Sequence, residues 1–145
     1  MHDDIERVLF DENRIRERIH VLGEEISRKH LGDELVVVAL LKGGVVFLAD
    51  LIRSIRIPMK LDLAWAWSYG EGTQSSGTVK LKVFPHEDLS GQTVLVVDDI
   101  LDTGRTLQQV CAKLKADLGA RRVETCVLLD KNARRVVDMQ ADYVG

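Results

Sequence analysis

The chain has 145 residues, of which 46% are hydrophobic and 30% are charged. This length suits one domain with a sizeable core, and the composition is that of an ordinary globular protein. The net charge of −3 gives no general attraction to nucleic acid. The longest apolar stretch, Leu35 to Leu41, is too short to span a membrane.

The two cysteines, Cys111 and Cys126, lie far apart and have no nearby cysteine or histidine at metal-ligand spacing. Each falls within an apolar segment, so we expect two buried thiols that remain reduced. The first residues, Met1 to Asp4, are acidic and lead into no apolar run of the kind found in secretory signals. These features predict a cytoplasmic protein with a single domain over residues 1–145.

The first half of the chain predicts helices alternating with strands. Asp11 can cap a helix that stops near Gly32. Leu35 to Leu41 reads as a buried strand, residues 45–54 as a helix, and Met59 to Trp67 as a second strand. This second strand places four large apolar side chains on one face: Leu61, Leu63, Trp65 and Trp67.

The second half continues the alternation. We expect strands at Val79–Phe84, at 94–98 and at Val123–Leu129, with the start of another strand at Ala141–Val144. An amphipathic helix opens near Gly104 and ends at Gly119. The pattern predicts an α/β fold with a central, mainly parallel sheet flanked by helices. In such sheets, ligands bind beyond the carboxyl ends of the strands.

The most informative segment is 94–106. A buried strand ends in the adjacent carboxylates Asp98 and Asp99, a third carboxylate follows at Asp102, and Thr103-Gly104-Arg105-Thr106 opens a helix. Amides and hydroxyls at a helix N-terminus can hold a phosphate, and carboxylates suit ribose hydroxyls and a hard divalent cation. The segment therefore predicts a site for a phosphorylated sugar.

This segment closely resembles the 5-phosphoribosyl-1-pyrophosphate (PRPP) binding motif of type I phosphoribosyltransferases. The resemblance implies that Asp98 and Asp99 hold the ribose hydroxyls and associate with Mg²⁺, where most members of the closest subfamily have Glu then Asp. It also implies that residues 102–106 hold PRPP and its 5′-phosphate. The counterpart of Asp102 in purine members is the general base beside the imidazole nitrogen. The alternative role for Asp102 is to cap the following helix.

Two further segments resemble motifs of the hypoxanthine-guanine subfamily. Lys42-Gly43-Gly44 resembles its pyrophosphate loop, in which a peptide bond without proline is often cis and glycines permit a close backbone approach. Ser68 and Tyr69 begin a stretch up to Thr78 that resembles the flexible lid, which excludes water from an oxocarbenium-like transition state. By itself, this stretch would only indicate a mobile surface loop.

Two more segments resemble the purine-binding residues of that subfamily. Lys131 matches the lysine that binds the oxo group of a 6-oxopurine by a charge-assisted hydrogen bond. Tyr143 and Val144 resemble an aromatic-valine-glycine segment, whose ring stacks on the base and whose valine backbone contacts the base edge. Taken alone, Lys131 would be an exposed lysine and Tyr143 a core or edge-strand residue.

The resemblance covers about Ile5 to Gly145 and lacks the further C-terminal strands of family members, so we expect a base pocket open on one side and weakened binding of the base. One alternative is therefore that the 145 residues are a folded but inactive fragment. The other interpretation follows from the resemblance itself. It predicts a purine-salvage enzyme that moves the phosphoribosyl group from PRPP to hypoxanthine or guanine with Mg²⁺, forming IMP or GMP and pyrophosphate. Family resemblance also suggests a homodimer or homotetramer.

The alternative is a PRPP- or nucleotide-sensing regulator that binds RNA, like the pyrimidine operon attenuators. The Asp-Asp pair and the Gly-Arg-Thr sequence resemble that group as well. However, attenuators usually carry a bulky residue in place of Asp102. The acidic isoelectric point near 5.8 and the context of Lys131 also favour the enzyme.

Overall fold

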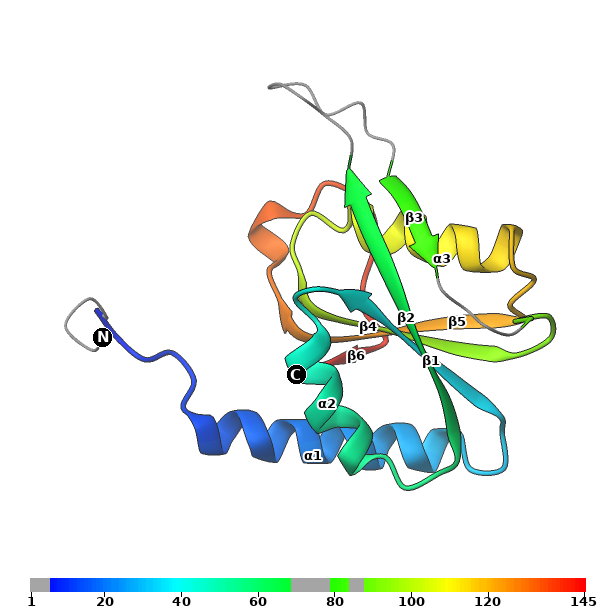
Figure 1. Cartoon of the computed structure of the whole chain (residues 1–145). Coiled ribbons are helices and arrows are strands. Elements are labelled where there is room, and N and C mark those ends of the chain that lie inside the picture. The colour runs from blue at the N-terminus through cyan, green and yellow to red at the C-terminus, as the bar shows by residue number, and fades with distance from the viewer. Residues whose placement is uncertain (1–5, 69–78, 84–87) are drawn as a thin grey trace.

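A computed structural model describes residues 6–68, 79–83 and 88–145 (Figure 1). Six strands form one sheet in the order β3-β2-β1-β4-β5-β6, and β3 alone among them runs antiparallel to its neighbour. Helices α1 and α2 cover one face of the sheet and α3 covers the other. This is the predicted α/β architecture.

The elements are α1 (Glu12–Lys29), β1 (Leu35–Leu41), α2 (Val45–Ser54), β2 (Met59–Ser68), β3 (Val79–Val83), β4 (Thr93–Leu101), α3 (Arg105–Ala116), β5 (Arg122–Asp130), the 3-10 turn η1 (Asn132–Arg134) and β6 (Tyr143–Val144).

Helix α1 begins where the sequence predicts. A side-chain oxygen of Asp11 accepts a hydrogen bond from the backbone N–H of Arg14 at 2.9 Å, which satisfies one of the free amides of the first turn. The helix ends at Lys29, slightly before the predicted stop near Gly32. It ends early because the chain turns immediately, with the N–H of Asp33 donating to the carbonyl of His30 at 3.0 Å.

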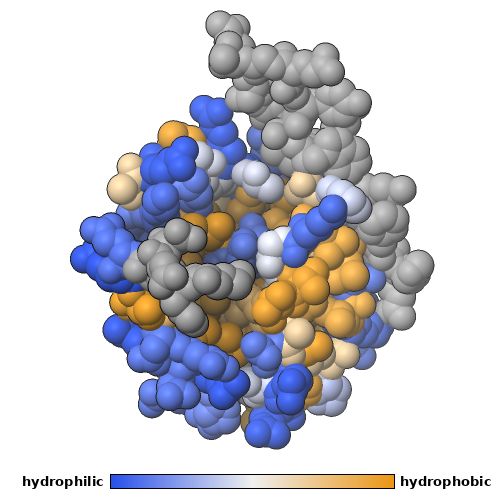
Figure 2. All heavy atoms as spheres, turned by 60° about the vertical axis from the view of Figure 1, so that its left-hand side comes forward, coloured by the Kyte–Doolittle hydropathy of each residue, from blue (hydrophilic) through white to orange (hydrophobic). Residues whose placement is uncertain are grey.

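An apolar groove of about 780 Å³ lies between the N-terminal segment, α1 and the end of β5. Figure 2 brings the left-hand side of Figure 1 forward and shows apolar side chains gathered around a hollow on this face. None of the predicted site residues lines the groove. Its lining residues are Val8, Leu9, Phe10, Arg14, Ile15, Glu17, Arg18, Val21, Leu128, Leu129 and Gly145.

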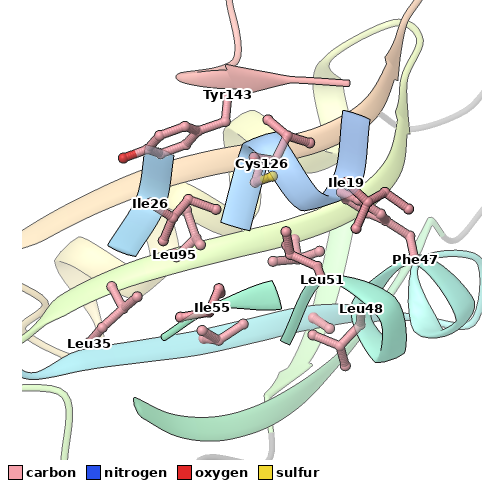
Figure 3. Close-up of a cluster of buried hydrophobic side chains, with 14 of the residues drawn as sticks. Ile19, Ile26, Leu35, Phe47, Leu48, Leu51, Ile55, Leu95, Cys126 and Tyr143 are labelled. Carbon is pink, nitrogen blue, oxygen red and sulfur yellow. The ribbon is translucent and has the colours of Figure 1, made fainter. Parts of the chain in front are cut away.

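The sheet separates two hydrophobic cores, and the interior strands contribute to both. In β1, Leu35 points into the core beneath α1 and α2 (Figure 3), whereas the next residue, Val36, belongs to the core on the α3 side. Both cysteines are free thiols; Cys126 is buried, as expected, whereas Cys111 is only partly buried. Burial raises the pKa of Cys126 to about 12 and that of Cys111 to about 11, so neither is a ready thiolate nucleophile.

Three of the large apolar side chains predicted for one face of β2 are described, those of Leu61, Leu63 and Trp65, and the face that they share is partly exposed. Leu61 is 47% exposed, Leu63 37% and Trp65 41%, while Ala64 on the opposite face is fully buried. The reason is the position of β2 next to the edge strand β3, because α2 packs over β1 and β4 instead.

Strand β4 is longer than the predicted 94–98 and runs through the acidic pair to Leu101. Its pairing with β1 ends at Val97, whereas its pairing with β5 continues through Asp98 to Leu101, opposite Asp130. The last residues of β4 therefore have a strand neighbour on one side only. The other side is open at the turn that follows β1, and this opening positions the candidate site.

Candidate active site

The acidic pair lies at the carboxyl end of β4. The backbone N–H of Asp99 donates to Oδ1 of Asp98 at 3.0 Å, and no described basic side chain forms an ion pair with either carboxylate. Burial, and then the charge of Asp99, raise the pKa of Asp98 to about 7. Two crowded oxygen ligands with uncompensated charge fit a hard divalent cation.

The same pair cannot enclose a metal ion by itself. Among the described residues there is no group of three or more His, Cys, Asp or Glu side chains that could hold a metal. Mg²⁺ is commonly held by one or two carboxylates, with waters and substrate phosphate oxygens completing its coordination. Asp98 and Asp99 fit this arrangement, in which the cation arrives with a phosphorylated substrate.

The glycine turn after β1 lies directly against the acidic pair. The Leu41–Lys42 peptide bond is cis, as the resemblance implies for this loop. A Cβ added to Gly43 would lie 2.5 Å from Oδ2 of Asp99, and one added to Gly44 would lie 3.3 Å from Cα of Asp98. Only glycine permits this approach at position 43, so the structure brings two predicted motifs together. The ammonium of Lys42 lies 5.3 Å from the centre of the Trp65 ring.

The turn after β4 leads into α3 without a side-chain cap. Gly104 is the N-cap residue with φ of +83°, and no side chain in the described part of the chain caps the first turn. The alternative role of Asp102 as the helix cap is therefore wrong. The uncapped amides and the positive end of the helix border a small cavity of about 120 Å³. Its lining residues are Asp98, Ile100, Leu101, Asp102, Thr103, Gly104, Thr106 and Leu107, and Arg105 lies exposed beside them.

Asp102 itself carries a buried oxygen, Oδ1, with no hydrogen-bond partner among the described residues. The other oxygen, Oδ2, lies 3.4 Å from Nη1 of Arg134, a side chain that is 63% exposed. A buried acceptor without a partner is costly, so its presence beside the cavity points to a ligand that donates a hydrogen bond there.

Lys131 lies at the same edge of the sheet. Its backbone N–H donates to the carbonyl of Leu101 at 2.9 Å, next to Asp102, and its side chain is exposed. Two further residues of this region were not identified from the sequence. The guanidinium of Arg135 contacts Asp102 in the turn after β4 and Asp130 at the end of β5, and Ile100 lines the cavity. No spacing signal distinguishes Arg135 from the neighbouring basic residues.

The predicted lid lies at the limit of the described chain. Ser68 is the last residue of β2. Tyr69 and the stretch up to residue 78 lie outside the described residues.

Tyr143 is not available for stacking on a base, which corrects the expectation for this residue. Its side chain belongs to the core beneath α1 and α2, is 7% exposed, and lies opposite Cys126 of β5. Val144 is also engaged, because its carbonyl accepts a hydrogen bond from Nε of Arg18 at 3.1 Å. The structure does not bring these two residues to the acidic site.

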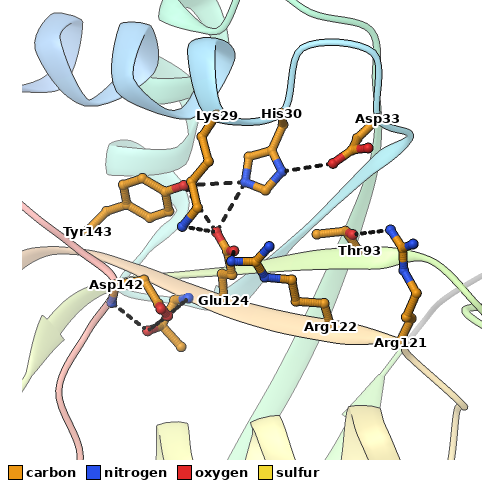
Figure 4. Close-up of polar contacts among 10 residues, drawn as sticks. Lys29, His30, Asp33, Thr93, Arg121, Arg122, Glu124, Asp142 and Tyr143 are labelled. Atoms are coloured by element: carbon orange, nitrogen blue, oxygen red, sulfur yellow. Dashed lines mark hydrogen bonds and ion pairs between the residues drawn. The ribbon is translucent and has the colours of Figure 1, made fainter.

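A second polar cluster lies near the amino end of β5 (Figure 4). The side chain of Glu124 is 2% exposed and contacts Nζ of Lys29 at 3.2 Å, Nε2 of His30 at 3.1 Å and the hydroxyl of Tyr143 at 3.0 Å. Its other oxygen pairs with Arg122 at 2.5 Å. Burial opposes ionisation, but the hydrogen bonds from Lys29 and Tyr143 outweigh it and lower the pKa of Glu124.

Comparison with known proteins adds an independent line of support. The sequence model of the phosphoribosyl transferase domain family matches residues 9–145. The hypoxanthine-guanine phosphoribosyltransferase of Aquifex aeolicus is 41% identical over 140 residues, which are 96% of this chain and 78% of that protein. A hypoxanthine phosphoribosyltransferase structure from Staphylococcus aureus superposes with a TM-score of 0.90 at 35% identity, covering all of this chain and 78% of that one.

The chain is also similar to part of much longer proteins. The bifunctional protein TilS/HprT of Listeria monocytogenes is 40% identical over all 145 residues, but these are only 22% of that protein. Among the described residues, no helix is long and apolar enough to cross a bilayer.

Proposed function

The chain belongs to the phosphoribosyl transferase family, close to its hypoxanthine-guanine members, and we propose that it transfers the phosphoribosyl group of PRPP to hypoxanthine or guanine. The observation that carries the proposal is the convergence of three features at one edge of the sheet. These are the acidic pair with its glycine turn, the uncapped start of α3, and the buried, unpartnered oxygen of Asp102.

PRPP binding uses the small cavity between the end of β4 and the start of α3. The first amides of the helix, with the hydroxyls of Thr103 and Thr106, hold the 5′-phosphate. Asp98 and Asp99 bind the ribose hydroxyls and would hold Mg²⁺, which neutralises the pyrophosphate leaving group when it is bound. The backbone of Gly43 faces the pyrophosphate, and Lys42 adds positive charge to the same turn.

The transfer step forms a bond between a base nitrogen and the anomeric carbon, while the bond from that carbon to the pyrophosphate oxygen breaks. The electron pair of the broken bond leaves with pyrophosphate. The free oxygen of Asp102 accepts the proton of the imidazole nitrogen, so that the nitrogen lone pair is available for attack. The ammonium of Lys131 donates a hydrogen bond to the oxo group, which favours 6-oxopurines over adenine. The carboxylates oppose the positive charge that develops on the ribosyl group.

The test is an assay with PRPP and hypoxanthine, guanine or adenine, with and without magnesium. We expect turnover of the 6-oxopurines only, and Asp102→Asn should lower kcat by about 10²–10⁴-fold. The matched control is Asp117→Asn, which removes an exposed carboxylate at the far end of α3 and should leave kcat unchanged.

Two outcomes would overturn the proposal. One is full turnover by Asp102→Asn. The other is PRPP binding without turnover of any base, combined with RNA binding that weakens steeply with salt, since that result identifies the RNA-binding regulator instead.

Self-association and a cytoplasmic location complete the proposal. The partly exposed Leu61, Leu63 and Trp65 of β2, together with Val46 of α2 at 75% exposure, provide apolar surface that a second copy would cover. The two free thiols are in keeping with a reducing compartment. Sedimentation of the purified chain tests the oligomeric state, and a monomer at all concentrations would exclude self-association.

A further inference from the structure

Arg135 is a mostly buried arginine that the reaction described above does not use. Its side chain is 12% exposed and follows η1, in the connection between β5 and β6. The guanidinium donates to five oxygens. These are the carbonyl of Asp102 from Nε at 3.0 Å, the carbonyl of Leu101 from Nη2 at 3.2 Å, the carbonyl of Met139, the carboxylate of Asp130, and Oδ1 of Asn132 at 3.4 Å.

These oxygens belong to two different loops. Leu101 and Asp102 end β4 and begin the turn with the proposed general base. Asp130 and Asn132 flank Lys131, which is proposed to donate a hydrogen bond to the oxo group of the purine. Strand pairing between β4 and β5 stops at Leu101 and Asp130, and the N–H of Lys131 still donates to the carbonyl of Leu101 at 2.9 Å. Beyond that bond, strand pairing no longer holds the two loops in register.

Residues 135–137 also contact the turn that leads into α3. The N–H of Val136 donates to the carbonyl of Thr103 at 3.1 Å. A Cβ added to Gly104 would lie 2.6 Å from Cγ2 of Val137 and 3.0 Å from Cδ of Arg135. The Arg135 segment thus packs directly against the phosphate-binding turn. The adjacent Arg134 differs, since it is exposed and pairs with the Asp102 carboxylate rather than with backbone.

We propose that Arg135 is a positioning residue that fixes the separation of Asp102 and Lys131, and through it the affinity and selectivity for the purine base. This inference rests on the proposed function. Arg135 holds the main chain of Asp102 by its carbonyl and leaves the Asp102 carboxylate free for the base. A planar guanidinium donates in several directions at once, which a lysine ammonium on its flexible stem cannot reproduce. Displacement of a catalytic group by about 1 Å can cost about 100-fold in rate.

The experiment compares Arg135→Lys and Arg135→Ala with Arg18→Lys. The control arginine also donates to a backbone carbonyl, that of Val144, but it lies in α1 and touches neither loop. We expect Arg135→Lys to raise KM for hypoxanthine about 10- to 100-fold and to narrow the preference for hypoxanthine over adenine. KM for PRPP should rise less than KM for hypoxanthine, because the hydrogen bonds of Arg135 go to the Asp102 turn and to the residues around Lys131 and not to the carboxylates of Asp98 and Asp99.

Chemical rescue provides the second measurement. Added guanidinium at low millimolar concentration should restore part of the hypoxanthine affinity of Arg135→Ala, and the same concentration of sodium chloride should not. Arg18→Lys should lower Tm without changing the base preference.

The inference is overturned if KM for PRPP and for the base rise together in proportion to the loss of Tm, which would make Arg135 only structural. It is also overturned if the base preference of Arg135→Lys equals that of wild type. A wild-type chain that neither turns over 6-oxopurines nor binds IMP overturns the proposed function itself, and this inference with it. Wild-type turnover with an unaltered Arg135→Lys preference overturns the positioning role alone.

Discussion

The two ends of the sheet hold acidic side chains in opposite surroundings, a buried one at the amino end and a partly buried pair at the carboxyl end. Near the amino end of β5, Glu124 is met by Lys29, His30, Arg122 and Tyr143, and its pKa lies below the ordinary value of 4.5. Each of these partners comes from an element packed against β5 or from β5 itself. This charge is neutralised within the protein, so the cluster stabilises the packing of α1 on the sheet.

At the carboxyl end, Asp98 has another carboxylate, Asp99, as its neighbour, and its pKa is raised to about 7. The protein leaves this charge uncompensated at the place where a cation and a phosphorylated sugar are proposed to bind. Perturbed carboxylates in a concave site are typical of functional positions, whereas satisfied clusters are typical of structural ones. In this molecule, the acid that is surrounded by basic partners stabilises the fold, and the acid whose neighbour is another carboxylate lies at the proposed site.

The largest effect on stability is expected for Glu124→Ala. The change leaves the buried His30 and the partly exposed Lys29 and Arg122 without their shared carboxylate, so the free energy of unfolding should fall by about 3 kcal/mol. Urea denaturation measures it. The control Glu24→Ala removes an exposed carboxylate of α1 and should cost about 0.5 kcal/mol or less. Equal losses would show that the cluster adds no stability.

Gly43→Ala should affect the carboxyl end of the sheet, where the glycine turn lies against the acidic pair. The added methyl would lie 2.5 Å from the Asp99 carboxylate, and displacing it should cost about 2 kcal/mol of stability and weaken PRPP binding. Calorimetric titration of PRPP and denaturation measure the two effects. Gly32→Ala is the control, because its Cβ meets open space and only its φ of +87° opposes the change. PRPP affinity equal to wild type in Gly43→Ala would argue against the turn as part of the site.

Asp98→Asn should stabilise the magnesium-free protein. A raised pKa means that the folded state binds the proton more tightly, so wild-type stability decreases as the pH rises from about 4 through about 7. The neutral amide lacks this penalty, so the variant should be more stable than wild type at pH 8, and the difference in free energy of unfolding should be smaller at pH 5. Thermal melts at both pH values, with chelator present, measure this difference. A variant less stable than wild type at pH 8 would contradict the uncompensated charge.

Glu124→Gln should change stability by a smaller amount than the variants above. Its effect should depend on pH in the opposite direction to that of Asp98→Asn. Because the pKa of Glu124 is lowered on folding, its ionised form stabilises the protein above pH 4.5, and this contribution is lost as the pH falls below that value. Wild-type Tm should therefore drop more than that of the variant between pH 6 and pH 3, by about 2–4 °C. Parallel curves for the two proteins would show that Glu124 is not held ionised by its partners.

The sequence by itself determined the features that depend on contiguous residues. Helix periodicity and the cap at Asp11 predicted α1, and the unbroken apolar run Leu35–Leu41 matches β1 residue for residue. The segment from Asp98 to Thr106 carried the PRPP motif because its carboxylates, turn and helix start are adjacent in the chain. Local propensity and motif chemistry suffice for such features, since no distant partner is needed to form them.

The tertiary structure decided which distant segments meet. Pairing with β5 extends β4 past the acidic pair, and the position of β2 beside an edge strand leaves Trp65 partly exposed. Contacts with Glu124 and the α1 core hold Tyr143 away from the site where its aromatic-valine-glycine sequence suggested it. The five oxygens that surround Arg135 come from both sides of it in the sequence. Periodicity states whether a residue is buried, but only the folded chain determines which groups it is buried against.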